Sequence, residues 1–201
     1  MIQISKWRIT ALVALGLTLL AAVTFAVSGY SEEALRSLVR ATARTSLLLF
    51  VMAMTASSLY SLFSRGWSKW LLQNRRYIGV SFALSHGVHL VLLILLGIDF
   101  PESILEQLQM KDLLGGGLAY VFILAMTITS FQRPRAWIGE KAWHVLHSSG
   151  IYFIWLIFFQ SYLFISLKHP AALPGLLLLI VALSLRLVRN LNRKQRSVHG
   201  R

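Results

Sequence analysis

The chain has 201 residues, of which 56% are hydrophobic and only 13% are charged, and its formal net charge is +13. Soluble domains carry about 25% charged residues, so the composition excludes an ordinary soluble domain and indicates an integral membrane protein. The apolar runs are continuous and rich in Leu and Ala, which favours helices over the alternating strands of a membrane barrel. We therefore predict an all-α protein, a six-helix transmembrane bundle that forms a single membrane domain over 1–201.

Six apolar runs approach the roughly 20 residues that a helix needs to cross a bilayer. In chain order the predicted spans are 9–29, 45–63, 77–98, 115–131, 143–166 and 171–188. The first run is long for the core of a signal peptide, so we expect it to remain as a spanning helix. The glycines at 115–117 lack the context of a nucleotide-binding loop, and we expect them to let the fourth span approach its neighbours closely.

The basic residues fall mainly on one side of this topology. If the six spans alternate, 15 of the 20 Lys and Arg lie on the side of both termini, and the positive-inside rule places that side in the cytoplasm. Five of the six tryptophans stand beside the same basic clusters, as an interfacial belt would. We therefore attribute the excess of basic residues to the membrane topology and not to a nucleic-acid-binding surface. We expect a multi-pass protein of a bacterial-type inner membrane, in contact with lipid and with both termini cytoplasmic.

Four of the six histidines form two HxxH pairs inside predicted spans, His86 with His89 and His144 with His147. Residues three apart share a helix face, and ionisable groups inside membrane segments are candidates for function. Such pairs can hydrogen-bond between helices, bind a transition metal directly, or ligate a haem iron with one histidine from each of two helices. The chain has no cysteine, which excludes covalent c-type attachment, so any haem is b-type.

Two stretches resemble a known family. RRYIGVSFALSHGVH at 75–89 and AMTITSFQRPRAWIGEKAWHVLH at 125–147 are similar to the ferric-reductase-like transmembrane domain, and most similar to its MsrQ-like haem-binding membrane subunits. The resemblance implies a haem b held between the third and fifth spans by His147 and either His86 or His89, with His144 as a neighbouring or alternative ligand. The resemblance favours His89, whereas depth counted from the flanking basic residues favours His86, so both remain open.

Two further positions bear on the cofactor. The family usually carries another histidine where this chain has Gln160, and an amide is a poor ligand for haem iron, so we expect one haem per chain. Arg44 ends a stripe of three arginines four residues apart and resembles an arginine of the family. Its expected partner is a haem propionate or an acidic protein, unless the neighbouring acids simply neutralise the stripe.

The resemblance implies a b-type cytochrome that passes electrons across or within the bilayer, as the electron-transfer subunit of an oxidoreductase system with no catalytic side chain of its own. Electrons would come from a quinol or a separate flavin reductase and go to an acceptor outside. Two alternatives use the same residues. One is a haem-free protein that binds a metal or translocates ions through the four histidines; the other is a non-catalytic assembly subunit that has kept only the fold.

Overall fold

The computed structural model of the chain describes residues 5–102 and 110–199. Its elements are α1 (Trp7–Ser28), α2 (Glu32–Phe63), α3 (Gly66–Asp99), α5 (Met110–Ile128), α6 (Gln132–Lys168), the 3-10 turn η1 (Pro170–Ala172) and α7 (Leu173–His199). The described part thus holds six long α-helices and no strand, which confirms the predicted all-α bundle. Five of these helices are long and apolar enough to cross a membrane, while the apolar described stretch of α5, Leu113–Ile128, is shorter.

Most helices are longer than the predicted spans, because polar residues at the ends of the apolar runs are also helical. The clearest case is α2, which begins at Glu32 instead of residue 45. The Ser31 hydroxyl caps this helix by accepting a hydrogen bond from the Ala34 backbone N–H at 3.3 Å. Two glutamates in the first turn add a favourable interaction with the positive end of the helix dipole.

The fourth predicted span is wrong at its end, since α5 stops at Ile128 and not at residue 131. The hydroxyls of Thr129 and Ser130 donate to backbone carbonyls one turn back, at 2.7 Å in both cases. Such side-chain bonds offer the backbone an alternative to the regular helix. The chain turns here, and α6 begins at Gln132.

α6 consists of two helical parts that meet at Gly139. This residue has φ 75° and ψ 163°, in a region of backbone space that glycine occupies far more readily than other residues. The predicted fifth span, 143–166, lies wholly within the second part. The break separates the basic stretch at 132–138 from the spanning helix.

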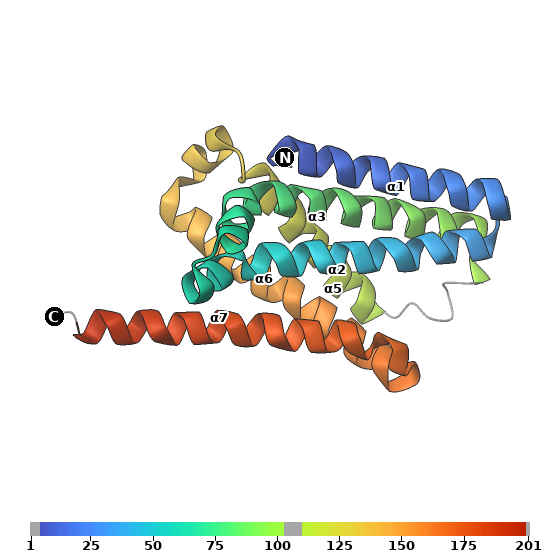
Figure 1. The fold of residues 1–201 in the computed structure, drawn as a ribbon. Coiled ribbons are helices and arrows are strands. Elements are labelled where there is room, and N and C mark those ends of the chain that lie inside the picture. The colour runs from blue at the N-terminus through green and yellow to red at the C-terminus, as the bar shows by residue number, and fades with distance from the viewer. Residues whose placement is uncertain (1–4, 103–109, 200–201) are drawn as a thin grey trace.

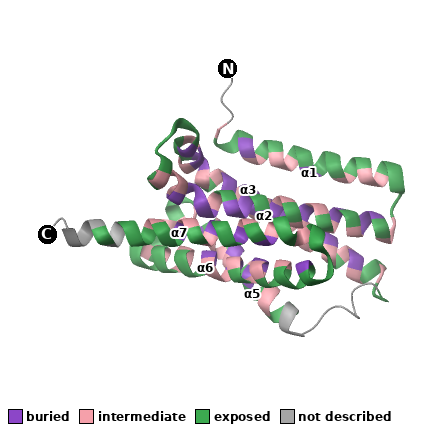
Figure 2. Cartoon of the chain, turned by 60° about the horizontal axis from the view of Figure 1, so that its bottom comes forward, coloured by how far each residue is buried: buried purple, intermediate pink, exposed green. Residues whose placement is uncertain are grey.

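Both termini lie at the same end of the bundle (Figure 1), which we call the inner end; the opposite end is the outer end. The closest pair of helices is α2 and α3, with α1 beside them, while α5 packs on α6 and α7 packs on α2 and α6. Small polar residues let α2 and α3 approach, as Ser46 and Ser85 show with a hydrogen bond of 2.9 Å between two fully buried hydroxyls. Figure 2 shows α1 exposed along most of its length, and its exposed side chains are largely apolar, as a lipid-facing helix requires.

Glycines create two other close approaches. A Cβ at Gly150 of α6 would collide with Met126 of α5, and a Cβ at Gly175 of α7 would collide with the ring of Tyr162. Of the glycine run at 115–117, only Gly115 lies against another helix, where a Cβ would stand 3.2 Å from Ile157. The prediction for that run is therefore confirmed at one position of three.

Candidate functional site

His144 turns away from the bundle. Its side chain is 67% exposed, and its Nε2 lies 3.3 Å from a carboxylate oxygen of Glu140, one turn earlier on α6. The two members of this HxxH pair therefore have different environments, and only His147 faces the helices.

His147 is held by Trp143 of α6 and by Thr129 in the turn between α5 and α6. Its Nε2 lies 3.1 Å from the Thr129 hydroxyl, and the Trp143 ring stacks on its imidazole at 4.4 Å between centroids. The Trp143 indole N–H donates to the Thr129 carbonyl at 3.0 Å. Because the Thr129 hydroxyl proton goes to the Ala125 carbonyl at 2.7 Å, its oxygen accepts from His147. The hydrogen-bond network therefore assigns the ring proton of His147 to Nε2.

His89 has the opposite tautomer. Its Nδ1 lies 3.1 Å from the Val39 carbonyl and 3.1 Å from the Thr42 hydroxyl, both on α2. A carbonyl can only accept, so Nδ1 carries the proton and Nε2 keeps the lone pair. This is the arrangement that a metal-ligating histidine usually has. In this structure the same contacts also join α3 to α2.

His86 lies among aromatic rings. Its imidazole stacks between Tyr120 of α5, at 4.9 Å, and His89, at 5.2 Å, with Phe158 of α6 at 5.5 Å. Its Nδ1 is buried and has no hydrogen-bond partner in the described part of the chain. An unpaired buried nitrogen costs about 1–3 kcal/mol, so the hydrogen-bonding capacity of the His86 ring is not met by its surroundings.

The two histidine pairs stand at different levels of the bundle. His86 contacts Tyr120 of α5, whereas His147 contacts Thr129, one residue past the end of that helix. The two contacts are nine residues apart, about 14 Å along a helix axis. Along α6, Phe158 at the level of His86 is eleven residues from His147, about 16 Å. In this packing His147 contacts residues at a different level of the bundle from those that contact His86. The four histidines do not converge on one metal ion, and the described residues contain no cluster of three or more potential metal ligands.

The depth comparison from the sequence left the choice between His86 and His89 open. It took the basic residues before each helix as one reference plane. The break at Gly139 and the place of Arg76 in the bundle undo that assumption, since Arg76 lines the same cavity as His147.

A cavity of about 500 Å³ opens beside His147 between α2, α3, α5 and α6, a volume in the range of ligand pockets. Its walls are mainly apolar, with Phe50 and Met54 from α2, Phe82 from α3 and Ile154 from α6. Arginines also line it, namely Arg75, Arg76 and Arg135, whereas His86 and His89 do not. The cavity therefore offers one imidazole, apolar walls and positive charge.

The three arginines differ in their partners. Arg135 pairs with Glu140 at 2.7 Å and lies over the Trp143 ring. Arg76 lies over the Phe131 ring at 4.8 Å, and Arg75 donates to the Ala53 carbonyl at 3.0 Å. Neither Arg75 nor Arg76 has a carboxylate within ion-pair distance among the described residues.

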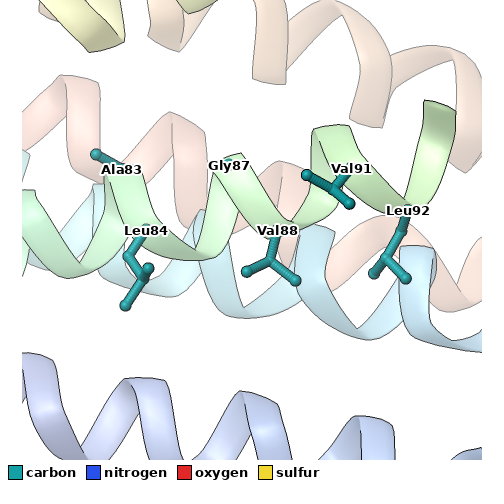
Figure 3. A pocket seen from close by; sticks show the side chains of 6 residues that line it. All are labelled: Ala83, Leu84, Gly87, Val88, Val91 and Leu92. Atoms are coloured by element: carbon teal, nitrogen blue, oxygen red, sulfur yellow. The ribbon is translucent and has the colours of Figure 1, made fainter. Parts of the chain in front are cut away.

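A second hollow, of about 530 Å³, lies along α3 and offers no comparable chemistry. Its six lining residues, Ala83, Leu84, Gly87, Val88, Val91 and Leu92, are all apolar and all come from α3 (Figure 3). No side chain there can bind a polar group, so it is a lipid-facing groove.

The predicted outer site at Arg44 is not assembled around a histidine. Arg36 pairs with Glu32 and Arg40 pairs with Glu33, both at 2.7 Å, so two arginines of the stripe are neutralised locally. Arg44 is exposed and has no ion pair among the described residues. At the same end Tyr30 donates a hydrogen bond to Asp99, which raises the pKa of Tyr30.

A family model described as the ferric reductase like transmembrane component matches residues 38–159, more than half of the chain. The chain belongs to the ferric reductase-like transmembrane family. Neither the comparison with curated proteins nor that with solved structures gives a match.

The family match covers α3 and α5, most of α2 and the part of α6 that carries His147. It stops one residue before Gln160, which is exposed on α6 and does not face the cavity. Membership supports a membrane electron-transfer role in general terms.

Sequence reasoning found the histidines of this site but missed their partners. Thr42 and Thr129 looked like ordinary helix residues, and Arg75 was counted only as a topology marker. One signal was available: the RR pair at 75–76 and the Thr-Ser at 129–130 both lie in the stretches that carry the family resemblance.

Proposed function

We propose that the chain is a b-type haem-carrying electron-transfer subunit, with the haem in the cavity beside His147. One observation carries this proposal. Within the family-matched region, the half-buried imidazole of His147 lines a mainly apolar cavity of about 500 Å³ that arginines also line. The bound haem would supply the one-electron chemistry, and the protein would supply binding, orientation and electrostatics.

The residues of the cavity suit such a group. His147 would hold the iron, and the aromatic and aliphatic walls would exclude water from the macrocycle. Arg76 has no carboxylate partner among the described residues, so its guanidinium would pair with a propionate, the geometry that Arg provides best. Gly79 adds room on the α3 wall, because a Cβ there would meet no atom within 4 Å.

The proposal is one haem per chain. The outer level offers His86 and His89 from α3, but Phe158 and Tyr120 pack directly against His86, and Gln160 is exposed. His89 therefore acts as a link between α2 and α3 in this account. His144 and Arg44 keep no role in iron binding.

The electron-transfer role of the family implies a separate donor and a separate acceptor. Its donor would be a quinol or a separate flavin reductase at the inner end, and its acceptor would lie beyond the outer end. The basic inner end supports a cytoplasmic placement of both termini in a bacterial-type inner membrane. The MsrQ-like relationship is a part of this proposal.

The test compares two alanine variants of histidines on the same helix. His147→Ala should lose most of the haem from the purified protein, since it removes the iron ligand. His144→Ala should keep it, because that side chain is 67% exposed and bonded to Glu140. Absorption at the Soret band against protein concentration gives the readout. Equal haem content in both variants would reject the assignment, and colourless wild-type protein from haem-replete cells would favour the assembly-subunit alternative.

A further inference from the structure

The buried face of α7 changes from apolar to basic toward the inner end. Leu179 and Ala182 are 0% and 1% exposed, and the next position on that face, Arg186, is only 8% exposed. An arginine in a membrane helix is costly to bury without an opposite charge. Arg189 continues the same face and is half-buried.

The contacts of Arg186 are neutral. Its Nε lies 3.2 Å from the Tyr152 hydroxyl oxygen, and its guanidinium lies over the Tyr152 ring at 4.9 Å. Arg75 on α3 is similar, because its Nε donates to the Ala53 carbonyl and its Nη1 donates to Ser57 at 3.2 Å. Each guanidinium has five N–H donors, so the hydrogen bonds of Arg75 and Arg186 leave donors for a further acceptor.

The three cations also repel one another. Arg75 interacts electrostatically with both Arg186 and Arg189, and the described residues place no carboxylate within ion-pair distance of Arg75 or Arg186. The acid of the inner end, Glu140, already pairs with Arg135. Among the described residues no negative charge offsets Arg75 and Arg186, and an anion from outside the chain would do so.

Of the three arginines, Arg75 also lines the cavity beside His147. Arg186 and Arg189 do not line the cavity beside His147. They lie on α7 next to exposed apolar residues, Leu187 and Leu191, which are 49% and 62% exposed. A basic pocket between helices at the inner end of a bundle is a setting in which lipid head groups bind, and Arg recognises phosphate through paired N–H donors.

We propose that Arg75, Arg186 and Arg189 bind the phosphate of an anionic phospholipid between α3 and α7 at the inner end. The bound lipid neutralises the cluster and joins α7 to the helices of the family-matched region. The two sites share Arg75, but Arg186 and Arg189 lie outside the cavity beside His147, so lipid binding can be tested on protein without haem.

The test measures binding of short-chain phosphatidylglycerol to the full-length protein in detergent by native mass spectrometry. Short-chain phosphatidylcholine and inorganic phosphate serve as the other two probes. Wild-type protein should retain phosphatidylglycerol and show a higher melting temperature with it than with phosphatidylcholine. Arg186→Gln should weaken phosphatidylglycerol binding by about tenfold or more, as expected when one partner of a buried charge pair is truncated.

Arg133→Gln is the matched control, because it removes one positive charge from an exposed position at the same end. It should leave phosphatidylglycerol binding within about twofold of wild type, as expected for an exposed charge. If inorganic phosphate stabilises the protein as well as phosphatidylglycerol does, the ligand is free phosphate and the lipid assignment is wrong. Equal binding of both lipids by wild type would also overturn it, and this comparison stands even if Arg186→Gln fails to fold.

Discussion

The nitrogen of His147 that usually binds metal, Nε2, is occupied by Thr129 at 3.1 Å. Iron and the Thr129 hydroxyl therefore compete for the same imidazole nitrogen. Binding of haem through Nε2 requires the ring to give up this hydrogen bond, which is worth about 0.5–1.5 kcal/mol.

Thr129→Val should accordingly raise the haem affinity of apo-protein by roughly two- to tenfold, since no hydrogen bond then opposes iron binding. Titration of apo-protein with haemin, followed at the Soret band, measures the change. Thr127→Val is the control, because Thr127 lines the cavity and makes the same kind of bond to a carbonyl one turn back, at 2.7 Å, without touching His147. Weaker haem binding by Thr129→Val alone would mean that the hydroxyl positions His147 for iron instead of competing with it.

At this scale the sequence predicted which side chains carry chemistry but not how each is held. The HxxH spacing singled out His89 and His147, and the structure gives them opposite tautomers. The difference comes from Thr42 of α2 and from Thr129 in the turn between α5 and α6. Many threonines in helices donate a hydrogen bond to a carbonyl one turn back, and the sequence does not show which of them also contact a histidine.

Among the helices, α5 and α6 form the wall that carries His147, and their close approach depends on Gly150. A Cβ there would collide with Met126 and lie 3.0 Å from the Phe122 ring. Gly150→Leu should destabilise the protein by about 1–3 kcal/mol, the usual cost of overpacking, and should lower its melting temperature in detergent.

Gly116→Leu provides the comparison on α5, because a Cβ at that position would meet no atom within 4 Å. Leucine favours helix over glycine by close to 1 kcal/mol, so this variant should melt at or above the wild-type temperature. Equal melting of the two variants would show that the α5–α6 contact is looser than described.

Hydropathy was sufficient to predict that these helices exist, because each carries a long apolar run. It did not predict their relative depth. Gly139 breaks α6 before the spanning part, and only the packed structure places Thr129 and Tyr120 beside histidines of different helices. The expected pairing of His147 with an α3 histidine on one iron depended on that depth.

For the whole molecule, the arrangement of α1 to α7 brings both termini to one end (Figure 1). In the predicted topology 15 of the 20 Lys and Arg lie on the side of the termini, and the positive-inside rule predicts that this side is cytoplasmic. Reporter fusions after Ser64 and Ser130 should therefore report the cytoplasm, and fusions after Tyr30 and His169 should report the outside. A cytoplasmic signal after His169 or an outside signal after Ser130 would contradict the topology.

The overall bundle was predictable because a lipid-spanning chain must satisfy its backbone within helices. The cavity was not, since it is formed by side chains of four helices that are far apart in the sequence. The basic residues of the inner end had been explained by topology alone, although Arg186 is buried and Arg75 is half-buried.

The most direct test of the central claim, one haem at the inner cavity on His147, is the haem-to-protein ratio by pyridine haemochrome assay. Wild-type protein and a His86→Ala, His89→Ala double variant should both give about one haem per chain, and His147→Ala should give close to none. A ratio near two in wild type, or loss of the haem from the double variant with retention in His147→Ala, would contradict the account.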